Sequence, residues 1–159
     1  MTVEEIHKGG CACGEVRYET KGEPQVHAVC HCRYCQLRTG SAFGMGAYFP
    51  ADKVEFNSGE QTQFRYETIS GNKVTTSFCK KCGSTTNWSI ESKMMAGMTA
   101  IAVGTFDPPT FWFKVTREIF CRSKAEFIEN DIENKFETSA SYKPTHKDCL
   151  LYTSDAADE

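Results

Sequence analysis

Short segments in which apolar and polar residues alternate run along most of the chain, and this alternation predicts β-strands. These segments are rich in Val, Thr, Ile and aromatic residues, which favour strands. They are EVRYET (15–20), AFGMGAYF (42–49), QTQFRYET (61–68), KVTTSF (73–78), TTNWSI (85–90) and MTAIAVGTF (98–106). Turn residues such as Ser58-Gly59 and Ser70-Gly71-Asn72 separate them. The pattern predicts a mainly β fold, a small antiparallel domain.

Helical periodicity is rare in this sequence. The best candidate runs from Lys124 to Glu133, with Ser123 as its N-cap and an apolar stripe formed by Phe127, Ile128 and Ile132. We therefore predict little helix beside the strands.

Length and charge indicate one domain with a short extension. The 159 residues suit a single core, which we place at 1–135, followed by a C-terminal extension at 136–159. The last ten residues carry three acidic groups and no Lys or Arg, so 150–159 is expected to be disordered or appended. Without them the net charge of −3 becomes zero. A neutral body lacks the basic patch that nucleic acids and anionic membranes need, so we expect neither as a partner.

Nine cysteines are the informative excess in the composition. The N-terminus shows no secretory signal, so we expect a cytoplasmic protein, with nuclear entry left open. Thiols stay reduced there, and dense cysteines then more often bind metal than form disulfides. Seven of the nine form short-spaced clusters, whereas Cys121 and Cys149 stand alone.

Two pairs of cysteines predict one closed metal site. Cys79 and Cys82 form a C-x2-C knuckle, and Gly83 supplies the left-handed backbone conformation that closes it. Cys11 and Cys13 form a second pair that is also followed by glycine. Four thiolates suit Zn²⁺ in a tetrahedral site, and a site with no free position has a structural role.

Cys30, Cys32 and Cys35 predict a second zinc site of a different kind. Three thiolates within six residues leave a fourth position open, as catalytic zinc sites do. In the alternative, the fourth ligand is His27, His31, Cys121 or Cys149 and this site is structural as well. Because His31 stands between two ligands, we expect its side chain to point away from the metal, toward the surface or a supporting position.

Polar residues directly after the third cysteine are candidates for binding a substrate. They are Gln36, Thr39, Gly40 and Ser41. In the alternative, this run is a tight turn in which the hydroxyls satisfy backbone groups. Arg33, Arg38, Lys80 and Lys81 lie in or near the cysteine motifs, either to screen the charge of the thiolates or as ordinary solvated residues.

The cysteine motifs and their surroundings resemble those of the glutathione-dependent formaldehyde-activating family, which includes centromere protein V. The resemblance rests on GGCACGEVRY (9–18), CHCRYCQLRTGSAFG (30–44), FCKKCGS (78–84) and VGTFDPP (103–109). It implies the small β fold called the β-tent, with two zinc sites. By this resemblance Cys11, Cys13, Cys79 and Cys82 hold a structural zinc, and Cys30, Cys32 and Cys35 hold a catalytic one.

Two positions depart from the pattern of the bacterial-type members. Glu118 stands where those members have His, and Phe127 stands where they have Trp. We expect Glu118 to point outward as a solvated strand residue. If it faced the pocket, it would need a cation such as Arg38, Arg117 or Arg122 beside it.

The resemblance implies a zinc-dependent carbon–sulfur lyase or thiol-adduct synthase. Its substrates would be glutathione, or another small thiol, and a small aldehyde such as formaldehyde, and its product an S-hydroxymethyl adduct. Three thiolates make zinc a weak Lewis acid toward water but a good holder of a fourth, nucleophilic thiolate. The alternative is a non-catalytic zinc module that binds a thiol or a protein partner on the same fold.

Overall fold

The structure is a computed structural model that describes residues 4–139. Strands make up 43% of it and helices 12%, which confirms the predicted mainly β fold. The strands are β1 (Ile6–Gly10), β2 (Arg17–Lys21), β3 (Val26–Cys30), β4 (Gly44–Pro50), β5 (Val54–Ser58), β6 (Gln61–Glu67), β7 (Lys73–Cys79), β8 (Thr85–Glu91), β9 (Met98–Ala102), β10 (Arg117–Ile119) and β11 (Asn134–Lys135). The helices are α1 (Arg33–Thr39) and the 3₁₀ turns η1 (Ala51–Lys53), η2 (Val103–Thr105) and η3 (Cys121–Ser123).

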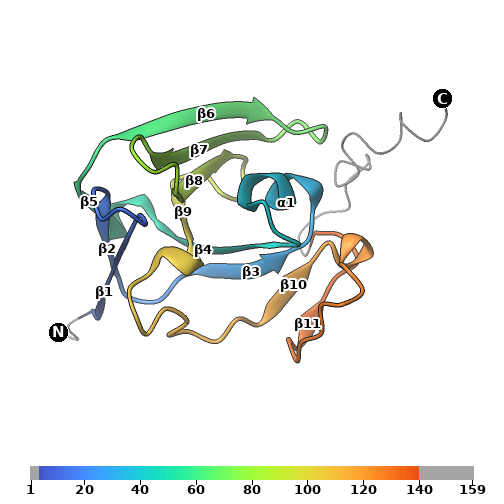
Figure 1. Cartoon of the computed structure of the whole chain (residues 1–159). Coiled ribbons are helices and arrows are strands. Elements are labelled where there is room, and N and C mark those ends of the chain that lie inside the picture. Colours follow the sequence, from blue (N-terminus) through green and yellow to red (C-terminus); the bar gives the residue numbers. More distant parts are fainter. Residues whose placement is uncertain (1–3, 140–159) are drawn as a thin grey trace.

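The strands form two sheets. Three strands pair in the order β1-β2-β5, and eight pair in the order β11-β10-β3-β4-β9-β8-β7-β6. In Figure 1 the small sheet lies at one end of the molecule, and β10 and β11 lie at the other. Pairing is antiparallel except that β10 runs parallel to both β3 and β11, so the large sheet is mixed. The long connection from β9 makes this possible, because parallel neighbours need a crossover rather than a tight turn.

Each of the six segments predicted as strands overlaps one strand of the structure. The last of them stops at Ala102, because the chain turns there into η2. Sequence patterning missed β1, β3, β5 and the two short strands β10 and β11. β1 contains two glycines, β3 runs into a cysteine motif and β5 is largely exposed, so apolar alternation is weak in them. β10 and β11 have only three and two residues, too few to show alternation.

The main core lies between the two sheets. Tyr18 of β2 packs with Phe49 of β4 and Ile101 of β9, and all three side chains are buried. The Tyr18 hydroxyl also bonds Thr105 at 2.8 Å. A Cβ at Gly9 would lie 2.3 Å from that tyrosine oxygen, so only glycine permits this close approach of β1.

The helix predicted from Lys124 to Glu133 is wrong. This stretch is irregular apart from one turn at 126–127, and in it the Asn130 side chain accepts a hydrogen bond from the backbone of Ile132 at 3.1 Å. Such side-chain to backbone bonds compete with a helical ladder.

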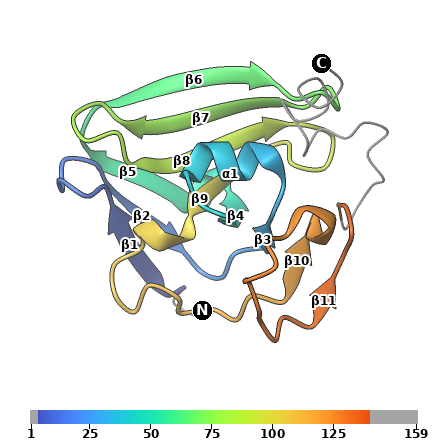
Figure 2. The ribbon, with the colours of Figure 1, turned by 45° about the vertical axis from the view of Figure 1, so that its right-hand side comes forward.

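The α-helix of the structure, α1, follows the second cysteine motif instead. In both views it lies between the part of the large sheet formed by β6–β8 and the part formed by β3 and β10 (Figure 1, Figure 2). It ends at Gly40, whose left-handed backbone bonds the carbonyl of Gln36 at 2.8 Å. Within the described part of the chain, no helix is long and apolar enough to cross a bilayer.

Candidate metal centres

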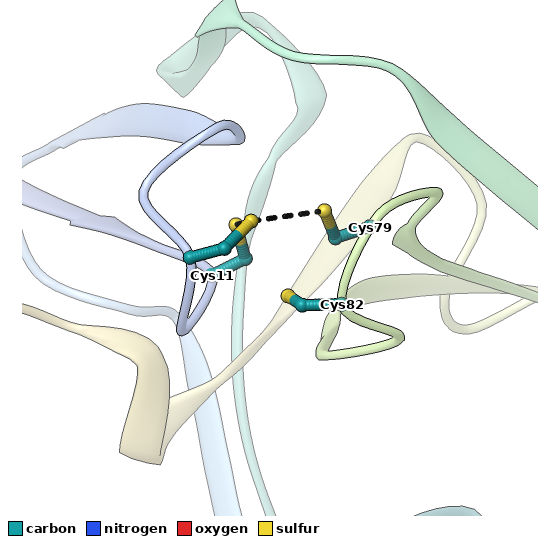
Figure 3. A group of neighbouring side chains, drawn as sticks. Cys11, Cys79 and Cys82 are labelled. Carbon is teal, nitrogen blue, oxygen red and sulfur yellow. Dashed lines mark hydrogen bonds between the residues drawn. The ribbon is translucent and has the colours of Figure 1, made fainter.

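Four cysteines from two distant turns meet in space. Cys11 and Cys13 lie on the loop between β1 and β2, whereas Cys79 ends β7 and Cys82 lies in the following turn. Their four sulfur atoms lie within 4.8 Å of one another. Figure 3 shows the side chains of the two turns pointing toward one another. The contact joins residues that are 66 positions apart and links the small sheet to the large one.

Each turn is shaped by its own backbone. The Val16 backbone N–H donates to the Cys11 sulfur at 3.2 Å, which fixes the first loop around its thiol. In the second turn Gly83 has a φ of 74°, as predicted, and its N–H bonds the Cys79 carbonyl at 2.9 Å. Ser84 connects the two turns, because its hydroxyl accepts from the Ala12 N–H at 3.2 Å.

The spacing of these sulfurs fits a zinc ion. The Cys11–Cys13 and Cys13–Cys79 sulfur distances are 3.5 and 3.8 Å, far longer than the ~2.05 Å of a disulfide. Tetrahedral zinc with sulfur ligands at ~2.3 Å places those sulfurs about 3.8 Å apart. Hydrogen bonds from Ser84 lower the pKa of Cys82 to about 5, which favours the thiolate that metals bind.

The second group is built from one short stretch. Cys30 ends β3, Cys32 caps the N-terminus of α1 and Cys35 lies in its first turn, with all three sulfurs within 4.8 Å of one another. The Cys32 sulfur accepts a hydrogen bond from the Cys35 N–H at 3.4 Å. Hydrogen bonds from Cys30 and Cys32, together with the charge of Arg38, hold the pKa of Cys35 well below that of a free thiol. The same contacts with its neighbours raise the pKa of Cys30, so the three thiols share their protons unequally.

No fourth protein ligand joins this group among residues 4–139. The structure leaves His27, His31 and Cys121 outside it, and Cys149 lies outside the described residues. The group therefore has three sulfur donors and no further ligand among these candidates, which is the donor set of a zinc site with one open position.

Arg38 connects the three thiols to a pocket. Its Nη2 donates to the Cys35 sulfur at 3.4 Å, and its guanidinium lies 3.7 Å from the centre of the Trp88 ring. A Cβ at Gly44 would lie 3.2 Å from both the Arg38 Nη2 and the Cys35 Cβ, which is tighter than an ordinary contact, so the glycine leaves room for these two side chains. The pocket has a volume of about 320 Å³, which is at the lower end for small-molecule sites. It is lined by Arg38, Thr39, Phe43, Gly44, Met45, Thr85, Trp88, Ala102, Val103, Gly104, Thr105 and Phe111.

The four polar residues predicted to bind substrate occupy α1 and the turn that ends it. The Thr39 hydroxyl bonds the carbonyls of Cys35 and Phe43 at 2.9 and 3.0 Å, and it accepts from the Ser41 N–H at 3.2 Å. Gln36 donates to the carbonyl of Ala42 at 3.3 Å. These contacts satisfy backbone groups of the turn, and Thr39 is the one of the four that also lines the pocket.

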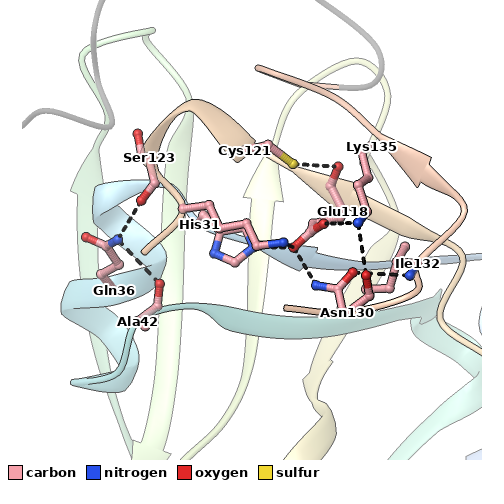
Figure 4. A network of polar contacts seen from close by, with 10 residues as sticks. His31, Gln36, Ala42, Glu118, Cys121, Ser123, Asn130, Ile132 and Lys135 are labelled. Atoms are coloured by element: carbon pink, nitrogen blue, oxygen red, sulfur yellow. Dashed lines mark hydrogen bonds and ion pairs between the residues drawn. The ribbon is translucent and has the colours of Figure 1, made fainter. Parts of the chain in front are cut away.

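Glu118 does not point outward, contrary to our expectation. Its side chain has no exposed surface and bonds the equally buried His31 ring at 2.8 Å (Figure 4). Burial alone would raise the pKa of Glu118, but hydrogen bonds from Asn130, Lys124 and His31 outweigh it and lower the pKa to about 2. The error has a physical cause: an acid can be buried when a cation faces it, and the partner here is Lys124 rather than Arg38, Arg117 or Arg122.

The family model described as glutathione-dependent formaldehyde-activating enzyme matches residues 6–123. This range holds both cysteine groups. The chain belongs to the glutathione-dependent formaldehyde-activating enzyme family. The fold is also similar to the crystal structure of a Rhodobacter sphaeroides protein, with a TM-score of 0.50 and 20% sequence identity. That match covers 68% of this chain and 96% of the other.

Two lysines near the cysteine motifs form ion pairs with acidic residues, and the aromatic residue that departs from the family pattern is exposed. Lys80 and Lys81 pair with Glu60 and Glu15, at 2.6 and 2.9 Å. Glu15, and to a smaller extent Cys13 and Cys79, raise the pKa of Lys81, so this lysine also lies close enough to the four-thiol group to screen its charge. Phe127 is 78% exposed.

The contacts that sequence reasoning missed are Arg38 over Trp88 and Glu118 against His31. The sequence held two signals for the pair of Glu118 and His31: the histidine stands between two cysteine ligands, and the acid stands inside an apolar strand segment. Nothing in the sequence pairs Arg38 with Trp88, because their contact depends on how α1 folds over the sheet.

We expect Cys79→Ser to destabilise the zinc-loaded chain much more than Cys32→Ser. A metal ion at the four-thiol group would join two turns that are far apart in the sequence, whereas one at the three-thiol group would join residues only a few positions apart. The metal replaces more loop-closure entropy in the first case, because closing a longer loop costs more entropy. Loss of a metal tie between the sheets therefore costs more folding free energy. Thermal unfolding followed by circular dichroism measures the difference, with Cys121→Ser as the matched control. An equal drop in melting temperature in the two variants would show that both groups contribute equally to the stability of the fold.

Proposed function

We propose that the chain is a zinc-dependent carbon–sulfur lyase or thiol-adduct synthase. It joins glutathione, or another small thiol, to a small aldehyde such as formaldehyde, and it also runs the reverse cleavage. The observation that carries the proposal is a group of three thiols, without a fourth protein ligand among the described residues, beside a pocket in a member of this family.

The two groups would hold two zinc ions with different roles. Cys11, Cys13, Cys79 and Cys82 would hold a structural ion, and Cys30, Cys32 and Cys35 a catalytic one. Zinc at the second group would supply the positive charge that keeps a substrate thiol deprotonated at neutral pH. Both groups need free thiolates, which fits a reducing compartment such as the cytoplasm.

The pocket residues bind and orient the substrate. Arg38 places a positive charge between Cys35 and the pocket, where it attracts an anionic thiolate or a carboxylate of glutathione. The faces of Trp88, Phe43 and Phe111 supply an apolar wall. Thr39 carries a hydroxyl at the same edge, while Gln36, Gly40 and Ser41 hold the shape of the turn beside it.

The proposed reaction forms one carbon–sulfur bond. The thiolate sulfur attacks the aldehyde carbon, and the electron pair of the C=O π bond moves to the oxygen. That oxygen then takes up a proton, which replaces the proton lost by the thiol, so the product is a neutral hemithioacetal. Because this addition also occurs without an enzyme, the gain must come from holding the two reactants in the attacking geometry.

The test follows the exchange of ¹³C-formaldehyde with its glutathione adduct by NMR. We expect the zinc-loaded chain to accelerate this exchange above the spontaneous rate. Cys35→Ser should return it to the spontaneous rate, while the matched control Cys121→Ser keeps the activity. A wild-type chain that leaves the spontaneous rate unchanged would contradict the proposal and favour the non-catalytic zinc module.

We expect Arg38→Met to lower kcat/KM for glutathione by about 10- to 100-fold. A hydrogen bond to a charged group contributes about 1.5–3 kcal/mol, and this variant removes the charge while it keeps much of the side-chain volume. The matched control is Arg65→Met, because Arg65 lies exposed on β6. Equal kcat/KM values for the two variants would show that Arg38 does not serve the substrate.

A further inference from the structure

A buried pair of polar side chains includes the residue that stands between two of the three thiols in the chain. His31 stands between Cys30 and Cys32, and neither its side chain nor that of Glu118 has any exposed surface. The His31 Nε2 and the Glu118 Oε1 are 2.8 Å apart. A fully buried carboxylate is rare in proteins and is retained only where partners compensate its charge. The burial of this polar pair therefore indicates a role other than filling space in the core.

The groups that compensate Glu118 come from the chain after the region matched by the family model. Asn130 donates to the Glu118 carboxylate at 2.7 Å, and the Lys124 ammonium lies 2.9 Å from it. Lys135 adds a second cation at 3.8 Å. The family match ends at residue 123, so all three partners lie beyond the matched range. Figure 4 shows the His31 ring and the Asn130 amide directed at the same carboxylate oxygen, Oε1.

Backbone hydrogen bonds fix the same two residues. The His31 N–H donates to the Ile119 carbonyl at 3.1 Å, where β10 runs beside β3. The Phe136 N–H donates to the Glu118 carbonyl at 2.9 Å. Phe120, the next residue after β10, is buried and has a φ of 57°, a left-handed conformation that is unfavourable for a bulky side chain. The surrounding contacts must hold it there, which indicates that β10 and the segment after it are rigidly placed.

We propose that Glu118, held by Lys124 and Asn130, is a positioning residue for the three-thiol group. It fixes the His31 ring and, through that ring, the relative placement of Cys30 and Cys32. A metal site binds tightly only when its ligands are already in place, and loss of such supporting contacts typically costs about 10- to 100-fold in metal affinity. The proposal rests on the proposed function only in requiring that the three thiols bind a metal ion.

The test measures Co²⁺ binding to the two cysteine groups of the full chain by thiolate-to-metal absorption, in competition with a chelator. Cys35→Ser, which keeps only the four-thiol group, identifies the signal of each site. We expect Glu118→Gln and Lys124→Met to weaken Co²⁺ binding at the three-thiol group by 10-fold or more. Binding at the four-thiol group should stay unchanged, and it serves as a control within the same molecule.

Matched controls come from an exposed ion pair in the same part of the chain, Lys114 with Glu133. Lys114→Met and Glu133→Gln should leave both affinities at the wild-type value. Lys124→Arg keeps the cation, so it should restore most of the affinity lost in Lys124→Met. If Glu118→Gln fails to fold, the Co²⁺ affinities of Lys124→Met and Lys124→Arg test the proposal. The Lys124 side chain is partly exposed, so replacing it disturbs the fold less.

The outcomes separate this proposal from the proposed function. Variants that melt at lower temperature but bind Co²⁺ with unchanged affinity, or that weaken both sites equally, would show that Glu118 has only a structural role. A wild-type chain that binds a single ion would overturn both proposals. Selective loss at the three-thiol group, in a chain without adduct-forming activity, would support the positioning role and overturn the proposed function alone.

Discussion

The convergence of four sulfur atoms from two distant turns is the constraint on which the rest of the fold depends. The small sheet carries Cys11 and Cys13, the large sheet leads into Cys79 and Cys82, and a common ion would tie the two sheets at this point. The apolar core between the sheets is modest, with Tyr18, Phe49 and Ile101 at its centre. A tie of this kind supplies stability that a core of this size does not.

The four-thiol group connects the two sheets, so the three-thiol group does not have to supply that connection. It lies within one strand end and one short helix, and the strand end is tied to distant parts of the chain by its pairing with β4 and β10 rather than by the thiols. Its neighbours serve two different needs. Arg38 brings positive charge to the pocket side of Cys35, while His31 and Glu118 form a buried pair beside the same stretch of chain. Under the proposed function, the buried contacts would hold the metal ligands in place while a substrate thiol exchanges on the pocket side.

Sequence reasoning found what local spacing determines. The cysteine pairs, the left-handed Gly83 and the six strands with clear alternation follow from residues close together in the chain, and the structure contains them. It failed where the answer depends on distant partners. The stretch 124–133 has a helical apolar stripe, yet Lys124 and Asn130 turn to a carboxylate from another element. Glu118 was placed outside for the same reason, since its burial depends on cations that only the folded chain brings near.

Native mass spectrometry of the zinc-loaded full chain, with and without glutathione, tests the central claim most directly. The account predicts two zinc ions per chain and a glutathione adduct on the two-zinc form. It also predicts that Cys35→Ser carries one ion and takes up no glutathione. A wild-type chain with one ion, or with two ions and no affinity for glutathione, would contradict the division into a closed four-thiol site and an open three-thiol site.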